Sequence, residues 1–210
     1  MKKNKLVIAL AIAAFSSTVM ADDEISYSFG AKSWNHQFKS DSTKLETTTS
    51  TLLSITARKG DYFVVGAFVL PTTYARDNTA LIIRRDSDLA LGWSASPNIS
   101  LLVGQKRLGA RNYDTDALVW ENEVINLSYL GANGFKMINE STYFYGQVNS
   151  SFKGKSNLTT TKVKLTTYEA GLGYVINKNT QLTGGYRMQK FSADSKVDMS
   201  GLTLGFNIGF

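Results

Sequence analysis

The chain has 210 residues, with 23 Lys and Arg against 17 Asp and Glu, one His and no Cys. Part of the formal net charge of +6 comes from lysines at the extreme N-terminus, so the charge gives little support for a nucleic-acid partner, and none is expected. Histidine is the side chain best suited to acid–base chemistry near neutral pH, so a single histidine limits the enzymatic options.

The N-terminus has the three parts of a secretory signal peptide. Lysines at positions 2, 3 and 5 precede an apolar run over 6–15, and Val19-Met20-Ala21 supplies the small residues of a cleavage site. The apolar run is much shorter than the roughly 18 residues that a retained membrane anchor needs. We therefore expect cleavage of residues 1–21, which leaves a single domain over 22–210 with a formal net charge of +3.

Alternation of apolar with polar or small side chains marks the strands, because side chains on a strand point to its two faces in turn. The clearest alternating segments are 25–32, 51–58, 88–95, 168–174, 181–188 and 201–210. Weaker candidates lie at 62–70, 99–108, 119–130 and 142–152, and in the last the outward pair is either Phe144 and Val148 or Tyr143 and Tyr145. Together they predict ten strands, with eight as the alternative.

These strands, rather than helices, are expected to cross a membrane. No stretch after Ala21 is apolar over the length of a helical span, and a closed barrel is the other structure that satisfies every backbone group in lipid. Connections at 58–61, 96–98, 131–139 and 177–179 are rich in turn residues, and most are short. Those at 39–46, 71–80, 109–117, 153–161 and 192–197 are longer or more polar. Short turns at one end and longer loops at the other are typical of an all-β, antiparallel up-and-down transmembrane β-barrel.

The C-terminus ends in unbroken alternation. Leu202, Leu204, Phe206, Ile208 and Phe210 share one face, and small or polar residues share the other. This segment resembles the closing strand of bacterial outer-membrane barrels, and the chain as a whole resembles the broad OmpA/OmpX-like group of small barrels without matching one family. The resemblance implies insertion into the cell outer membrane, with Phe206, Ile208 and Phe210 recognised by the barrel-assembly machinery.

The direction of the apolar face separates a membrane barrel from a soluble, lipocalin-like one. The face opposite the apolar one is rich in Gly, Ser and Thr, a poor filling for the core of a soluble barrel. Aromatic residues on the apolar face fall near the ends of strands, as expected of an interfacial girdle. The predicted girdle consists of Tyr27, Trp93, Tyr129 and Tyr174.

Few residues form patterns that carry chemistry. His36 is the only candidate acid or base, and we expect it at the rim of the barrel, exposed or hydrogen-bonded at the base of a loop. The architecture also resembles that of outer-membrane lipid-modifying enzymes and omptin-type proteases, but no motif of those families surrounds His36. The pairs Asp86-x-Asp88 and Asp114-x-Asp116 carry too few ligands for a calcium site, so neither a metal nor a cofactor is expected.

The interior of the barrel offers the better-founded prediction. Charged residues on the polar face are Lys32, Arg58, Asp88, Glu169 and Arg187. Both signs of charge in a narrow lumen predict a hydrogen-bonded plug rather than a wide channel. Many further basic residues, among them Arg84, Arg85, Lys106, Arg107 and Arg111, are assigned to the outer loops, where contact with lipopolysaccharide phosphates is one interpretation and plain solvation the other.

The predicted function follows by elimination: an outer-membrane barrel with a structural or surface-interaction role and no enzymatic activity. A narrow porin-like channel and a lipid-modifying enzyme are the alternatives. Outer-membrane lipids, including lipopolysaccharide, are the expected partners, and the oligomeric state stays open.

Overall fold

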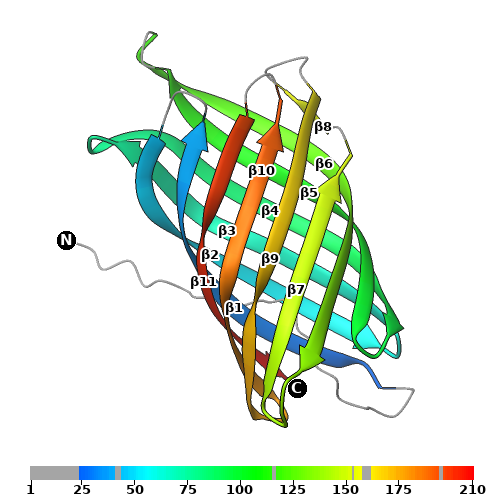
Figure 1. The fold of residues 1–210 in the computed structure, drawn as a ribbon. Coiled ribbons are helices and arrows are strands. Elements are labelled where there is room, and N and C mark those ends of the chain that lie inside the picture. Colours follow the sequence, from blue (N-terminus) through cyan, green and yellow to red (C-terminus); the bar gives the residue numbers. More distant parts are fainter. Residues whose placement is uncertain (1–23, 41–43, 115–116, 153, 158–161, 194–195) are drawn as a thin grey trace, which may run out of the picture.

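Antiparallel strands make up nearly all of the computed structural model (Figure 1). The structure describes residues 24–40, 44–114, 117–152, 154–157, 162–193 and 196–210, so the predicted signal peptide lies outside the described residues. The strands are β1 (Ser26–Ser40), β2 (Lys44–Lys59), β3 (Tyr62–Arg76), β4 (Thr79–Ser96), β5 (Ile99–Asp114), β6 (Val119–Met137), β7 (Thr142–Ser151), β8 (Gly154–Ser156), β9 (Lys162–Asn177), β10 (Thr180–Ser192) and β11 (Lys196–Gly209). In this part of the chain no helix has the length and apolar character needed to cross a membrane.

The strands close into one barrel. β1 pairs with β11 over thirteen positions, from Ser28 opposite Gly209 to Ser40 opposite Val197. At the very end, Tyr27 and Phe210 exchange two backbone hydrogen bonds of 3.0 and 2.9 Å, and their rings stack. β7 and the three-residue β8 both lie between β6 and β9, so they share one position in the wall. The prediction of a ten-stranded antiparallel barrel is confirmed, and the eight-stranded alternative is wrong.

The outer face of the barrel carries an apolar band next to the end with the short turns, which we call the turn end. Large exposed apolar side chains in this band include Tyr27 on β1, Leu89 and Leu91 on β4, Val103 on β5 and Leu172 on β9. Beyond the band, toward what we call the loop end, the outer positions become polar: β1 continues with Ser33, Asn35 and Gln37, and β5 with Gln105 and Arg107. A lipocalin-like barrel would have pointed its apolar face inward, so the outward band matches the membrane alternative.

Several predicted connections are in fact strand. β1 runs to Ser40, β3 to Arg76 and β5 to Asp114, so most of the predicted loops 39–46, 71–80 and 109–117 belong to the wall. The predicted turn 131–139 is likewise strand up to Met137. Above the band water replaces lipid outside the barrel, so these strand ends have polar residues on the outer face and lose the alternation that identifies a strand.

The two prolines mark different features. Pro97 lies in the turn between β4 and β5, as predicted. Pro71, which was assigned to a connection, lies inside β3 at a register shift between Val69 and Thr72. Proline cannot donate a ladder hydrogen bond, and the β2–β3 ladder ends at the pair Leu52–Val69. Beyond it, Thr48 Oγ1 donates to the Thr73 carbonyl at 3.1 Å, and the Asn78 N–H donates to Glu46 Oε1 at 3.0 Å.

Candidate functional site

The interior of the barrel is the candidate site, and apolar clusters lie on both sides of a polar middle. Toward the turn end lies a cluster of Phe63, Val65, Ala90, Leu102 and Tyr129. Toward the loop end lie two more, one around Trp34, Leu45, Tyr74 and Met199 and one around Leu108, Leu127 and Leu165. The interior is thus more apolar than its Gly, Ser and Thr content predicted.

Glu169 is the centre of the first ionic network. It lies on β9 with its side chain 2% exposed, directly opposite Arg187 on β10 in the strand register. Its carboxylate contacts Lys32 Nζ from β1, lies 3.8 Å from Arg187 Nη1 and accepts a hydrogen bond of 3.0 Å from the Tyr145 hydroxyl on β7. Four strands from both ends of the chain are therefore linked through one carboxylate.

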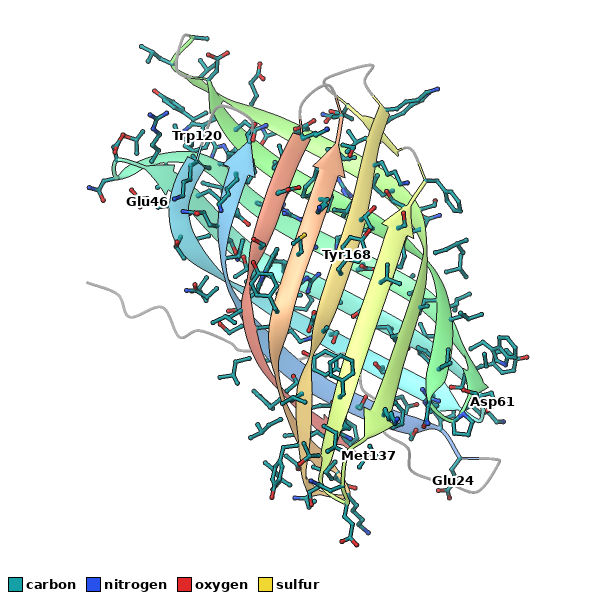
Figure 2. The ribbon with its side chains drawn as sticks, in the orientation of Figure 1. Glu24, Glu46, Asp61, Trp120, Met137 and Tyr168 are labelled. Carbon is teal, nitrogen blue, oxygen red and sulfur yellow. The ribbon has the colours of Figure 1, made fainter. Side chains whose placement is uncertain are left out.

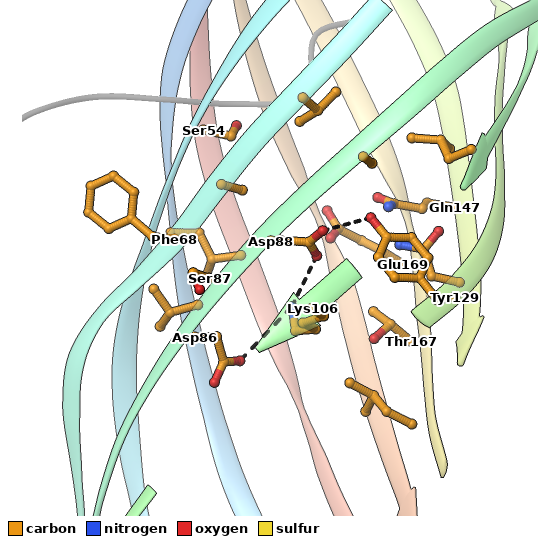
Figure 3. A pocket seen from close by; sticks show the side chains of 18 of the residues that line it. Ser54, Phe68, Asp86, Ser87, Asp88, Lys106, Tyr129, Gln147, Thr167 and Glu169 are labelled. Atoms are coloured by element: carbon orange, nitrogen blue, oxygen red, sulfur yellow. Dashed lines mark hydrogen bonds and ion pairs between the residues drawn. The ribbon is translucent and has the colours of Figure 1, made fainter. Parts of the chain in front are cut away.

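A second network crosses β4, β5 and β6. Asp88 lies between Lys106, at 3.3 Å, and the Tyr129 hydroxyl, at 2.8 Å (Figure 3). Lys106 also lies 4.0 Å from Asp86, whose carboxylate is held by the guanidinium of Arg84 through two hydrogen bonds. Arg84 then donates to Gln189 Oε1 on β10 at 3.1 Å, so the two networks together span the lumen.

The five predicted lumen charges therefore divide into three groups. Lys32, Glu169 and Arg187 lie together, and Asp88 belongs to the second network. Arg58 joins neither: near the turn end it donates to Ser94 Oγ at 2.8 Å, and its guanidinium lies over the Phe63 ring.

The sequence analysis missed Arg84, Asp86 and Lys106, because it placed the two cations in outer loops and considered Asp86 only as part of a possible calcium site. All three side chains are almost fully buried in the lumen. The signal was present: Arg84, Asp86, Asp88, Ala90 and Gly92 follow one another at a spacing of two. Extending the predicted strand 88–95 backward by four residues would have placed Arg84 and Asp86 on its inner face.

Tyr129 corrects the predicted girdle. Tyr27, Trp93 and Tyr174 are exposed on the outer face, whereas Tyr129 is 6% exposed and points into the lumen. Its ring lies over Gly104 of the neighbouring strand, where a Cβ would come within 2.6 Å of the ring. Both faces of 119–130 carry apolar residues, so alternation alone did not fix the direction of Tyr129. In 142–152 the faces are now clear, with Phe144 and Val148 outside and Tyr143 and Tyr145 inside.

Gly104→Ala tests this packing. The added Cβ would displace the Tyr129 ring and its hydrogen bond to Asp88, so we expect a loss of about 1–3 kcal/mol in the free energy of unfolding, the range for overpacked cores. Urea unfolding of the vesicle-inserted protein measures it. Gly66→Ala on the outer face of β3 is the matched control, because its Cβ would lie 3.7 Å from Ile55, an ordinary contact. Equal stabilities of the two variants would contradict the packing.

His36 was expected to be either exposed or hydrogen-bonded near the rim, and the structure shows it buried and hydrogen-bonded. It lies on the inner face of β1, on the part of the strand beyond the apolar band, and is 1% exposed. One ring nitrogen lies 2.9 Å from the Trp34 carbonyl and the other 2.8 Å from the Tyr74 hydroxyl, and the Trp34 ring stacks on the imidazole. The pKa of His36 is lowered to about 4, chiefly by burial; the hydrogen bond to the Trp34 carbonyl raises it, and the nearby cations Arg84 and Arg187 lower it. Both ring nitrogens are engaged in structural contacts.

A cavity of about 120 Å³ remains between the two networks. Its lining includes Asp88, Lys106, Glu169 and Arg187, and also Asn133 and Asn149. Three buried polar atoms of this lining lack a protein partner, namely Asn133 Oδ1, Asn149 Oδ1 and Arg187 Nε. A space of this size is large enough for several water molecules, which could bond to these polar atoms. Within the described residues no group of three or more His, Cys, Asp or Glu side chains is placed to hold a metal ion.

Comparisons with known proteins place the fold. No protein-family model matches the chain, and no curated protein matches it. Among solved structures, the outer membrane protease OmpT from Escherichia coli is similar with a TM-score of 0.52 and 10% identity, over 94% of this chain and 100% of OmpT. The COG4313 outer membrane channel from Pseudomonas putida F1 gives 0.48 and 8%, over 89% and 95% of the two chains. Ail, the attachment invasion locus protein of Yersinia pestis, gives 0.34 and 18%, over 89% and 98%. The chain thus shares the barrel fold of the outer membrane protein OmpT, and at 10% identity the likeness concerns the fold alone.

Proposed function

We propose that this protein is an integral barrel of the bacterial outer membrane that acts as a closed scaffold presenting its loop end to the surroundings. The observation that carries the proposal is the pair of ionic networks, which join Lys32, Glu169 and Arg187 on one side of the lumen and Arg84 to Asp88 on the other. Charges linked in this way fill the space that ions or solutes would need. The apolar clusters at both ends of the networks add to the closure.

The outer surface supports the location. The apolar band matches the hydrocarbon of a membrane, and the polar strand ends beyond it match water or lipid headgroups. Both chain ends of the barrel lie at the turn end, where Phe210 pairs with Tyr27, and in outer-membrane barrels the short turns face the periplasm. The loop end then faces outward and meets lipopolysaccharide.

The burial of His36 favours a role without catalysis. Its imidazole lies beneath Trp34 and contacts Tyr74, and neither ring nitrogen points to a carboxylate or to a cavity open to substrate. A narrow channel is the stronger alternative, because a cavity lined by residues of both networks lies inside the barrel.

Conductance in planar lipid bilayers separates the two functions. We expect the refolded wild-type protein to give no discrete current steps, since the paired charges and the apolar clusters occupy the lumen. Insertion is verified separately by heat-modifiable gel migration, and a known porin reconstituted in the same way is the control. Current steps from the wild type, with an ion selectivity that changes in Glu169→Gln or Arg187→Gln, would show a conducting lumen and overturn the proposal.

A further inference from the structure

Three exposed arginines gather on the outer face of β4 and β5, directly beyond the apolar band. They are Arg85 on β4 and Arg107 and Arg111 on β5. Each alternates with a residue of the lumen wall, since Arg84, Asp86, Lys106 and Leu108 point inward. This is a different surface from the ionic networks inside the barrel.

The strand register brings the three side chains together. Arg85 lies directly opposite Gly109, and Arg107 and Arg111 lie two residues to either side of that glycine. Diagonal neighbours of this kind are separated by about 7–8 Å, within reach of long side chains. The Arg85 side chain lies over Gly109: its Cγ and Nε would be 3.3 and 3.5 Å from a Cβ built there. Arg85 therefore occupies the space between the other two arginines.

No acidic side chain compensates this cluster within the described residues. None of the three arginines forms an ion pair there, and the cross-strand partners of Arg107 and Arg111 on β6 are Asn126 and Asn122. The nearby Glu123 points inward, where it accepts hydrogen bonds from Ser156 and Asn112. Arg111 is held in place by the Trp120 ring, 5.1 Å from its guanidinium carbon, and Trp120 lies at the loop end, far from Asp61 and Glu24 (Figure 2). Uncompensated like charges on adjacent strands are destabilising unless an anion lies between them.

The height of the cluster indicates which anion. Arg85 and Arg107 each lie four residues beyond an exposed apolar residue, Leu89 and Val103, which is about 14 Å along a strand and about 10 Å along the membrane normal at a tilt of about 40°. Arg111 lies four residues further out. A phospholipid headgroup layer is only about 5–8 Å thick, so it reaches the first two arginines at most. A glycolipid with phosphates on a larger sugar headgroup spans all three.

From this arrangement we propose that Arg85, Arg107 and Arg111 form a binding site for the phosphate groups of a phosphorylated glycolipid of the lipid A type, with its acyl chains on the adjacent apolar band. The guanidinium is suited to this role because its planar set of donors binds phosphate oxygens two at a time. The site names a partner for the scaffold and rests on the proposed location in the outer membrane.

Titration of the refolded, detergent-solubilised protein with bis-phosphorylated lipid A tests the site. We expect tighter binding than to the same lipid with both phosphates removed and than to phosphatidylglycerol. Arg85→Gln/Arg107→Gln/Arg111→Gln should weaken lipid A binding by about tenfold or more, about 1.4 kcal/mol. The Arg→Lys triple variant should recover only part of the affinity, since lysine keeps the charge but not the paired donors.

Two further variants separate the site from general positive charge. Lys155→Gln/Lys162→Gln/Lys164→Gln removes the same charge from exposed positions on β8 and β9 and should leave binding unchanged. Gly109→Leu changes no charge but displaces Arg85, so it should weaken binding. An equal loss in the lysine variant, no loss in the arginine variant, or equal affinity for phosphatidylglycerol would overturn the inference. Heat-modifiable migration and bilayer conductance test the scaffold separately, so a barrel that inserts and stays closed without binding lipid A would refute the site alone.

Discussion

Glu169→Gln is expected to lower the free energy of unfolding by about 3–5 kcal/mol, the range measured when one partner of a buried ion pair is removed. The amide keeps the shape of the side chain, but Lys32 and Arg187 then lie buried beside a neutral group. Tyr145 also donates its hydroxyl to this carboxylate, so the substitution weakens a bond to a fourth strand. Urea unfolding in lipid vesicles, followed by tryptophan fluorescence, measures the change.

The controls for Glu169→Gln use the same chemistry elsewhere. Glu121→Gln alters a carboxylate on the exposed end of β6 and should change stability by less than about 0.5 kcal/mol. Lys32→Met combined with Glu169→Gln removes one of the two cations that Glu169→Gln leaves unpaired. The double variant should therefore lose less unfolding free energy than the sum of the losses in the two single variants. A Glu169→Gln protein as stable as wild type would show that the network contributes nothing.

Acidification should destabilise the barrel through His36. In the unfolded chain the His36 imidazole is protonated near its ordinary pKa of 6.5, whereas in the folded protein, with a pKa of about 4, it is protonated only in stronger acid. Between these values the unfolded state holds more protons, so stability is complete above about pH 6.5 and is lost as the pH falls toward 4. The full loss is about 3 kcal/mol, from 1.36 kcal/mol for each pKa unit.

A comparison with His36→Gln isolates this effect from the titration of carboxylates. Glutamine can still hydrogen-bond the Tyr74 hydroxyl but carries no proton to gain in this range. The difference in unfolding free energy between the two proteins, measured at several pH values from 4 to 7.5, should therefore change with a midpoint inside that window. A constant difference would mean that His36 does not titrate as its burial implies.

The sequence was sufficient for the architecture because membrane strands carry a period that is easy to follow. Apolar residues face lipid and small or polar residues face the lumen, so the alternation shows that Tyr27, Leu89 and Leu172 point outward. The alternation is lost where that contrast ends. Arg84 and Lys106 lie on strand segments at or beyond the loop-end edge of the apolar band, where both faces carry polar residues. Tyr129 lies on a segment with apolar residues on both faces.

The composition of the networks was beyond sequence reasoning for a different reason. Alternation assigns Lys32, Asp88 and Glu169 to the lumen but says nothing about which strands face each other across it. Lys32 and Glu169 are 137 positions apart and meet only because β1 closes on β11. The burial of His36 depends in the same way on Tyr74, which reaches it from β3.

The interrupted ladder between β2 and β3 has one more consequence. Above Leu52 and Val69 the ladder between β2 and β3 stops, and there the two strands are joined by hydrogen bonds from the side chain of Thr48 and to the side chain of Glu46. A strand that lacks ladder hydrogen bonds on one side opens more readily than one that is paired on both sides. Backbone amides of residues 44–51 should therefore exchange with deuterium faster than those of the loop-end part of β5, which is hydrogen-bonded to both β4 and β6.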